Sequence, residues 1–525
     1  MSDDAASMPA DAPVTSTLTI DSRRPADSRR PAIAPDVEAQ RRRDIVRRLA
    51  PPMPADTGRA WIATLVLVLA AAIVRLVNLG FPQRLVFDEA YYVPEAEQIL
   101  RYGFEENRAY YFIVHPPFGK WNIALGEWLF GYTPNGWRFS AVLAGVIAIA
   151  LLTFVVRRIT RSTFLGLAAG VMLACDGFSF VLSRTGILDI FLQVWVLAGF
   201  VCIVLDRDRF RAQLAAAYES GRSYGRWGPA VGFRWWRLAA GVCFGLAMSV
   251  KWSGGYFLAI FAILSVWWDV GAYRLIGLRR PYLVAIRRSL PFAFWDLALV
   301  PALTYLASWI GWFAGESAQG RHWAEGRASD YPFIPEAIRS WWHMQGEWLT
   351  FHNELSSPHP FESGPWSWLF TGRPVLMLND HFNQQGTDTW NTIVMIGNPA
   401  LWWVFALAAL WCCWRLITRR DWAAAAVIGG IVAGWALWLI NTDRTMFMFY
   451  MAPVVPFFIL AIALCLQDVL GSRSDLPLRR KAGAAGVSAY LALVIVLFVF
   501  FLPVLNGSDM STEERSARMW LSTWG

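Results

Sequence analysis

The stretch Trp61–Gly80 reads WIATLVLVLAAAIVRLVNLG, twenty residues with a single charge. A helix of this length crosses a hydrocarbon core of roughly 30 Å. Soluble globular proteins carry about 25% charged residues, whereas this chain of 525 residues is 16% charged and 56% hydrophobic. The chain is therefore predicted to be a membrane protein.

Ten further apolar runs follow, which predicts an all-α polytopic membrane protein with about 11 transmembrane helices. They lie near residues 138–156, 163–181, 186–205, 237–250, 253–271, 291–313, 397–416, 422–440, 446–467 and 485–504. If successive spans alternate in direction, all the Arg-rich connections fall on one side. The positive-inside rule makes that side cytoplasmic. We therefore expect a protein of the plasma (inner) membrane with a cytoplasmic N-terminus and a periplasmic C-terminus.

The polar segments divide the chain further. Residues 1–59 are rich in Pro, Ala, Asp, Ser and Arg and are expected to form a disordered, basic cytoplasmic tail. Residues 60–505 form the membrane domain, and residues 506–525 a C-terminal periplasmic tail. Two long polar segments, 81–137 and 314–396, are expected on the periplasmic side. Any active site is expected to face the periplasm, because these two segments hold most of the candidate chemical groups.

The net charge of +8 does not indicate nucleic-acid binding, because the Arg clusters lie between apolar spans, where membrane topology explains them. All six cysteines fall inside apolar runs and form no CxxC pair. Neither a disulfide framework nor a zinc site is therefore expected.

The first polar segment opens with FDEAYY, residues 87–92, only a few residues beyond the first span. A carboxylate of Asp88 or Glu89 at the membrane surface is suited to act as a base toward a hydroxyl group. Tyr91 and, further along, His115 in HPPFGK are candidate substrate contacts. The alternatives are a solvated turn around the acidic pair and an ordinary proline-bounded loop around His115.

Four cations stand at the expected outer ends of spans, namely Arg138, Arg184, Lys251 and Arg444. Together they could bind the phosphate of a lipid-linked donor and offset the charge on the departing phosphate. The alternative is that they snorkel to the membrane surface or form structural pairs, such as Arg184 with Asp189.

The second polar segment contains a predicted amphipathic helix, Pro335–Asn353, with Trp348 and His352 on one face. His343 lies nine residues before His352 and therefore on the opposite face, so the two cannot share a metal ion. His359 follows in HPFESGPWSW. HExxH is absent, and no metal site is predicted. The tryptophans fit a membrane-interface belt or a platform for sugar or acceptor.

Taken in order, these motifs resemble the protein O-mannosyltransferase family (polyprenyl phosphate mannose–protein mannosyltransferases). The resemblance runs from about Trp61 to Val504. It rests on FDEAYY, HPPFGKW, WRFSA, SRTGILD, SVKWSG, WWHMQ…FHNEL…HPFESGPWSW and RTMFMFYMAPVVPFF. The segment 314–396 is too short to include the MIR domain of eukaryotic members. This departure suggests the bacterial, actinobacterial branch and leaves open how the acceptor is recognised.

The resemblance implies a GT-C glycosyltransferase fold and inverting transfer of mannose from polyprenyl phosphate mannose to Ser/Thr hydroxyls. It places the catalytic Asp at Asp88, its acidic neighbour at Glu89, an arginine important for activity at Arg138, and a donor-phosphate ligand at Lys251. No cofactor is required in principle, although a divalent cation stays open. The implied partners are the donor lipid, unfolded Ser/Thr-rich secreted proteins and the bilayer, with the Sec translocon as a further candidate.

Two other readings are open at this stage. A GT-C transferase could instead add a sugar from a polyprenyl phosphate donor to a lipid or cell-wall glycan. A polytopic transporter would place its charged groups along a path at the membrane midplane, whereas most of the charges here gather at one expected surface.

Overall fold

The computed structural model describes residues 35–106, 114–221, 224–384, 387–472 and 475–525, and it is predominantly helical, as predicted. The chain divides into two compact units, Met1–Asp44 and Ile45–Gly525. Within the described residues, the first unit consists of the beginning of helix α1. The second unit holds the membrane domain and every site described below.

The helices and strands follow one another along the chain as a long helical series interrupted by one hairpin. They are α1 Pro35–Leu49, α2 Thr57–Leu76, α3 Glu89–Tyr102, α4 Phe118–Phe130, α5 Pro134–Thr160, α6 Thr163–Ala174, α7 Gly177–Leu182, α8 Asp189–Glu219, α9 Trp235–Val250, α10 Gly254–Leu275, α11 Pro281–Arg288, α12 Leu290–Phe294, η1 Trp295–Leu299, α13 Val300–Ser308, α14 Ile310–Ala314, α15 Glu336–Glu354, α16 Pro365–Trp368, β1 Leu376–Gln384, β2 Thr387–Val394, α17 Pro399–Arg419, α18 Trp422–Gly434, η2 Ala436–Leu439, η3 Met448–Val454, α19 Val455–Leu470, α20 Pro477–Asn506, β3 Asp509–Met510 and α21 Thr512–Ser516.

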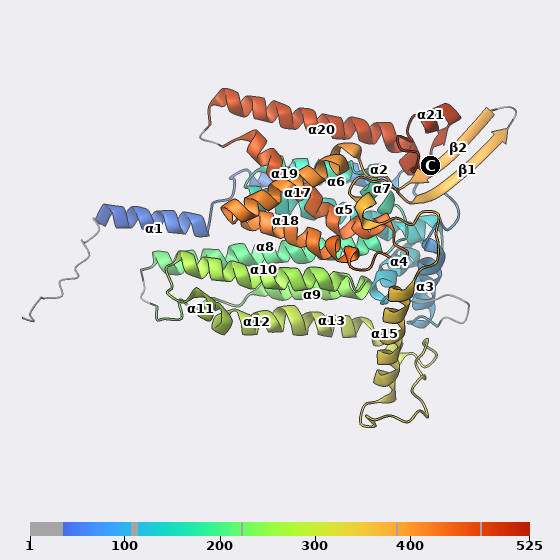
Figure 1. Ribbon diagram of the computed structural model, residues 1–525, viewed down its shortest axis with the longest axis horizontal. Coiled ribbons are helices and arrows are strands. Elements are labelled where there is room, and N and C mark those ends of the chain that lie inside the picture. Colours follow the sequence, from blue (N-terminus) through green and yellow to red (C-terminus); the bar gives the residue numbers. More distant parts are fainter. Residues whose placement is uncertain (1–34, 107–113, 222–223, 385–386, 473–474) are drawn as a thin grey trace, which may run out of the picture. The chain divides into compact units, whose positions relative to one another are not determined.

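Among the described residues, eight helical segments are long and apolar enough to cross a membrane. They are α2, α5, α8, α10, the run α12–η1–α13, α17, the run η3–α19 and α20. Three shorter apolar helices, α6, α9 and α18, run beside them (Figure 1). The chain is a multi-pass membrane protein, and the predicted number of about eleven spans stays a prediction.

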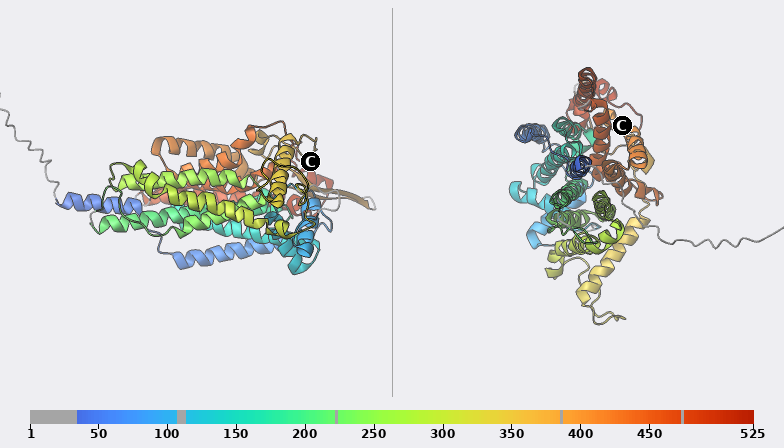
Figure 2. Two further views of the ribbon diagram at one scale, coloured as in Figure 1. Left: turned by 90° about the horizontal axis from the view of Figure 1, so that it is seen from below. Right: turned by 90° about the vertical axis from the view of Figure 1, so that its left-hand side faces the viewer.

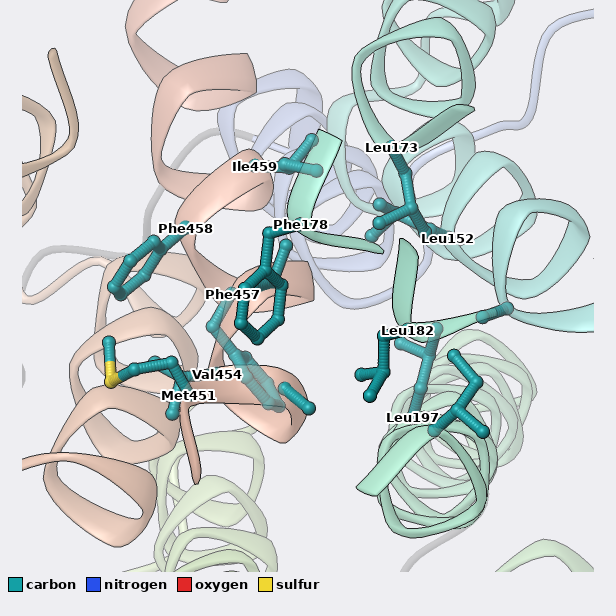
Figure 3. Packing of buried hydrophobic residues seen from close by; sticks show 14 of the residues in the cluster. Leu152, Leu173, Phe178, Leu182, Leu197, Met451, Val454, Phe457, Phe458 and Ile459 are labelled. Carbon is teal, nitrogen blue, oxygen red and sulfur yellow. The ribbon is translucent and has the colours of Figure 1, made fainter. Parts of the chain in front are cut away.

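Helix α19 occupies the centre of the bundle. Phe457, Phe458 and Ile459 of α19 belong to the same buried apolar cluster as Phe178 of α7 and Leu197 of α8 (Figure 3). In contrast, α2 and α20 expose most of their apolar side chains. Since burial of apolar surface stabilises a helix against its neighbours, whereas apolar surface left outside fits lipid, α2 and α20 are lipid-facing helices.

The predicted span 163–181 is broken in the structure. Helix α6 ends at Ala174, and Asp176 begins the short helix α7, where its carboxylate accepts a hydrogen bond from the backbone N–H of Ser179. The same carboxylate accepts a hydrogen bond from the indole of Trp402 at 2.9 Å. An N-cap of this kind starts a new helix, so a run of apolar letters in the sequence hides the break.

The polar segments gather at one end of the second unit. Helices α3, α4 and α15 lie there together with the hairpin β1–β2 (Figures 1 and 2). Helix α11 and the Arg-rich connections α8–α9, α17–α18 and α19–α20 lie at the other end (Figure 1). The alternation of spans expected from the sequence agrees with this arrangement.

A small antiparallel sheet, in the order β1–β2–β3, adds to the all-α architecture expected from the sequence. Its register pairs His381 with Trp390 and Asn391 with Asp509. The hairpin lies within the predicted segment 314–396, and β3 and α21 lie within the predicted tail 506–525. The indole of Trp524 is buried and donates a hydrogen bond to the carbonyl of Thr371, which ties the end of the chain to this segment.

A disordered tail was predicted over residues 1–59. Positions 1–34 of this segment lie outside the described residues. From Pro35 onward the chain is helical in α1. Within the second unit, Leu49 is buried and its carbonyl accepts a hydrogen bond from Arg211. The basic stretch also carries apolar residues at helical spacing, Ile45, Val46 and Leu49, which explains why this part of the segment packs.

Candidate active site

Asp88 lies at the N-cap position of α3, and its side chain makes no capping hydrogen bond. The preceding residue, Phe87, has a left-handed φ of 49°. Its ring contacts the rings of His359, Phe447 and Phe449 edge-on at 5.4, 5.4 and 5.8 Å. These aromatic contacts offset an unfavourable backbone conformation, and backbone strain of this sort concentrates at functional sites. The turn therefore presents a carboxylate that helix capping does not use.

Tyr92 positions this carboxylate. It lies four residues after Asp88 on the same helix face, and its hydroxyl donates to Asp88 Oδ2 at 3.4 Å. The Tyr92 ring is buried and lies 6.0 Å from the ring of His115. Tyr91, the candidate taken from the sequence, is about half exposed and does not line the cavity described below.

Glu89 holds the protein's own structure together through hydrogen bonds. Its carboxylate is fully buried and accepts hydrogen bonds from Arg138 Nε and Nη2, both at 2.8 Å. It also accepts from the backbone N–H groups of Gly186 and Val86. A carboxylate with so many donors is held rigidly in one position.

The guanidinium of Arg138 is likewise bonded within the protein. Besides Glu89, its guanidinium donates to the carbonyls of Leu79, Pro82 and Arg84. A guanidinium has five N–H groups, and these bonds use all five. Arg138 therefore fastens the loop before Asp88 to helix α5, and it has no donor left for a phosphate.

Arg184 stands between α7 and α8 and reaches the end of α2. Its guanidinium donates to the carbonyls of Arg75, Val77 and Asn78. Carbonyls at a helix C-terminus lack partners within the helix, and a cation there satisfies them. Like Arg138, Arg184 supports the loop rather than lining a cavity.

Lys251 follows α9 directly, and its Nζ lies 2.7 Å from the carboxylate of Asp189 at the start of α8. Its Nζ also lies 5.4 Å from the ring centre of Phe449 and 5.6 Å from that of Tyr450. The partner of Asp189 is thus Lys251, and not Arg184 as one reading of the sequence had it.

Arg444 has no carboxylate within ion-pair distance in the part of the chain that the structure describes. Its guanidinium lies 5.5 Å from the ring centre of Trp438 and 6.0 Å from that of Tyr450. Its Nε is buried without a hydrogen-bond partner. This cation is therefore available to an anionic ligand.

Two histidines meet beside these cations, His115 from the loop before α4 and His352 from helix α15. The rings of His115 and His352 are stacked, with centroids 5.1 Å apart. His352 Nε2 lies 2.9 Å from the carbonyl oxygen of Val114. Burial, with nearby cations including Lys251 adding to the effect, holds the pKa of His115 well below its usual range, and burial also lowers the pKa of His352. Both rings are thus neutral at neutral pH and can bind hydroxyl groups.

Buried Lys120 holds His115 in place. Its ammonium donates to the carbonyl of His115 and pairs with the carboxylates of Glu95 and Glu105. This links α3, the loop after it and α4. The lysine of HPPFGK is therefore a positioning residue for the loop that carries the histidine.

A cavity of about 130 Å³ joins these groups. Lys251, Arg444 and Asp189 supply its charged lining, and His115, His352 and Tyr450 supply further polar groups. Apolar side chains such as Trp252, Phe257 and Leu192 continue the wall. A pocket with two cations and an apolar wall suits the phosphate of a lipid and the chain attached to it.

Asp88 lies near enough to feel the charges of this cavity. Burial raises the pKa of Asp88 to about 6, Lys251 lowers it, and Asp189 raises it again. At pH 7 the carboxylate is mostly ionised, yet its proton affinity is higher than that of an ordinary aspartate. This balance suits a general base working near neutral pH.

The remaining candidates do not line the cavity. His343 stacks on Trp323 and pairs with Glu347 at 3.1 Å, on the opposite face of α15 from His352, as the helical spacing predicted. Trp348 is buried against Trp309. His359 contacts Phe87, next to Asp88. In the described residues, no group of three or more His, Cys, Asp or Glu side chains is arranged to hold a metal ion.

Sequence reasoning missed Tyr92 and Tyr450, and it gave Asp189 the wrong partner. The spacing of four residues between Asp88 and Tyr92 could have indicated the first of these, since such residues meet on a helix. In the sequence, the position of Tyr450 within an apolar run gives no sign that its ring faces two cations.

The helical bundle has the GT-C fold of membrane glycosyltransferases. The structure of the Saccharomyces cerevisiae protein O-mannosyltransferase Pmt1–Pmt2 complex bound to the sugar donor matches with a TM-score of 0.71 at 15% identity, over 92% of this chain and 94% of that one.

Sequence comparison specifies the family. Family models described as dolichyl-phosphate-mannose-protein mannosyltransferase match residues 65–137 and 114–219. A model of the C-terminal four-span region of protein O-mannosyltransferase matches residues 337–524. The polyprenol-phosphate-mannose–protein mannosyltransferase of Mycobacterium tuberculosis is 41% identical, over 90% of this chain and 93% of the relative. That of Corynebacterium glutamicum is 35% identical, over 84% and 88%. The chain belongs to the protein O-mannosyltransferase family.

Proposed function

We propose that this protein transfers mannose from a polyprenyl phosphate donor to Ser/Thr hydroxyls of exported proteins, with inversion at the anomeric carbon. The observation that carries the proposal is the uncapped carboxylate of Asp88 beside a cavity with two cations, Lys251 and Arg444. The names of its relatives support the donor and the acceptor class.

In the proposed reaction, Asp88 accepts the proton of the acceptor hydroxyl as its oxygen attacks the anomeric carbon of mannose. The bond from that carbon to the phosphate oxygen breaks, and polyprenyl phosphate leaves with the electron pair. Lys251 and Arg444 stabilise the charge on the departing phosphate. Glu89 and Arg138 hold the loop that carries Asp88, and His115 and His352 offer neutral hydrogen-bonding groups to the sugar or the acceptor.

We propose an orientation in which this site faces the periplasm of a plasma (inner) membrane. The Arg-rich connections at the opposite end of the bundle support it through the positive-inside rule. Acceptors would then be unfolded Ser/Thr-rich chains that emerge from the Sec translocon. Two cations at the leaving phosphate also make a metal ion unnecessary, so transfer is expected to persist in the presence of EDTA.

The experiment that tests the function supplies membranes containing the protein with labelled polyprenyl phosphate mannose and a Ser/Thr/Pro-rich peptide. Label on the peptide, released by β-elimination as mannose, is the expected result. Label appearing only on an endogenous lipid or glycan would instead favour a transferase with a non-protein acceptor.

The pH dependence of transfer follows from Asp88. Its pKa of about 6 means that the base is unprotonated above this pH and protonated below it. The kcat/KM is therefore expected to fall about tenfold per pH unit below pH 6, since it reports the free enzyme. Because the charge of Lys251 lowers this pKa, Lys251→Gln should shift the acid limb to higher pH. An acid limb in the wild type that lies below pH 5 would contradict the assignment of Asp88.

Arg444→Gln is expected to raise the KM for the donor about 10- to 100-fold, because a charge-assisted bond to phosphate is worth about 1.5–3 kcal/mol. The control is Arg84→Gln, an exposed arginine at the same end of the protein that pairs with Asp380. Donor titrations of both variants at saturating peptide measure the difference. Equal effects of the two substitutions would argue against a phosphate contact at Arg444.

A further inference from the structure

A second charged cavity, of about 530 Å³, lies at the opposite end of α9 from the candidate active site. Arg234, the N-cap residue of α9, lines this cavity, whereas Lys251, the C-cap residue, lines the first. The 16 residues of α9 span about 24 Å at 1.5 Å per residue, so the two cavities are separate sites.

Four arginines line the second cavity: Arg234, Arg237, Arg287 and Arg288. Arg234 pairs with Asp206 and Asp269, and Arg237 pairs with Asp296 at 2.8 Å. No carboxylate of the described chain lies within ion-pair distance of Arg287 or Arg288. Four guanidinium groups thus face three carboxylates, and the cavity carries a net positive charge.

Arg237 provides an independent sign of a missing ligand. Its side chain is 1% exposed, and its Nη1 has no hydrogen-bond partner among the residues that the structure describes. The distance from Arg237 Nη1 to Asp269 Oδ2 is 3.9 Å, which is too long for a hydrogen bond. A buried guanidinium donor without a partner is unfavourable, and an anionic oxygen in the cavity would satisfy it.

The walls of the cavity indicate where such an anion comes from. Phe292 and Trp295 line it and expose 62% and 51% of their surface. They belong to the run α12–η1–α13, one of the segments able to cross a membrane. The ring of Trp227 lies 4.4 Å from the guanidinium of Arg287. Arginines beside exposed aromatic rings on a membrane helix match a phosphate that carries acyl chains.

We propose that this cavity binds the phosphate of an anionic membrane phospholipid. Arg237, Arg287 and Arg288 contact the phosphate oxygens, and the acyl chains lie along Phe292 and Trp295. The site is independent of the proposed transferase reaction, because it shares no residue with the first cavity.

The test compares two double variants that change the net charge equally. Arg287→Gln with Arg288→Gln removes the unpaired cations of the cavity. Arg279→Gln with Arg280→Gln removes two exposed arginines just before α11 that do not line it. Each purified full-length protein is titrated with phosphatidylglycerol, with phosphatidylcholine of the same chains and with inorganic phosphate. Native mass spectrometry counts the bound lipid, and thermal unfolding without lipid checks the fold.

The wild type is expected to retain phosphatidylglycerol in preference to phosphatidylcholine. The cavity variant should bind it at least roughly tenfold more weakly, and the control within about twofold of wild type. Equal weakening in both variants would overturn the proposal in favour of general surface charge. Equal binding of the two lipids would remove the role of the phosphate charge. Displacement of the lipid by millimolar inorganic phosphate would mean a free-phosphate site instead.

Discussion

Replacement of Asp88 by Asn is expected to lower mannosyl transfer about 10²- to 10⁴-fold, the range over which a general base contributes to catalysis. The amide has nearly the shape of the carboxylate but cannot accept the proton of the acceptor hydroxyl. Since Asp88 makes no capping bond, and Tyr92 supplies its one side-chain hydrogen bond within the described residues, the variant should fold normally. Label transfer to peptide at equal expression measures the loss.

The matched control for this prediction is Asp330→Asn. Asp330 is exposed on the loop before α15, at the same end of the protein. Its replacement by Asn changes the net charge by the same amount as Asp88→Asn. It should leave transfer within about twofold of wild type, since surface substitutions have small effects. Transfer that survives Asp88→Asn would leave the family assignment intact and remove Asp88 from the role of base.

Glu89→Gln is expected to lower the free energy of unfolding by about 3–5 kcal/mol, because it leaves Arg138 as a buried cation without its anion. Both side chains are almost completely buried, and they share two hydrogen bonds of 2.8 Å. Activity should fall as well, since the loop before Asp88 is fastened through Arg138. Unfolding in mixed detergent micelles, followed by tryptophan fluorescence, measures the stability.

Helix α3 itself offers the control. Glu97, eight residues further on, pairs with Arg101 on the exposed side of the same helix. Glu97→Gln should change stability by no more than about 1 kcal/mol, because exposed ion pairs contribute little. A Glu89→Gln protein with wild-type stability and no activity would contradict the scaffold role and indicate that Glu89 takes part in the chemistry itself.

Local patterns predicted much of this protein. The helix expected over Pro335–Asn353 is observed as Glu336–Glu354, and it places His343 and His352 on opposite faces, as its periodicity requires. Apolar run length located the membrane helices, because a helix must match the thickness of the bilayer wherever it occurs. It did not give all of their ends: the run predicted at 186–205 belongs to the longer helix α8, Asp189–Glu219, and the run at 163–181 is broken after α6. The sheet formed by β1, β2 and β3 was not expected. Strands β1 and β2 form a local hairpin that the sequence analysis missed, whereas β3 pairs with β2 from more than a hundred residues away in the chain.

The four cations show where local pattern stops being informative. In the sequence, Arg138, Arg184, Lys251 and Arg444 all stand at the ends of apolar runs and are equivalent. In the structure, Arg138 and Arg184 bind backbone carbonyls of the loop before Asp88 and the end of α2. Lys251 and Arg444 line the cavity. The partners of each cation come from distant parts of the chain, so spacing in the sequence carries no information about them.

The sequence by itself determined the membrane class, the family, the acidic pair after the first span and the sidedness pattern of the arginines. These depend on composition, run length and motif order, which are local or additive properties of the chain. Only the tertiary structure decided that the carboxylate of Asp88 makes no capping hydrogen bond, whereas that of Glu89 is bonded to Arg138. It also decided which cations line the cavity and are available to a phosphate. That division depends on which donors and acceptors are already satisfied, and hydrogen-bond satisfaction is set by the whole fold.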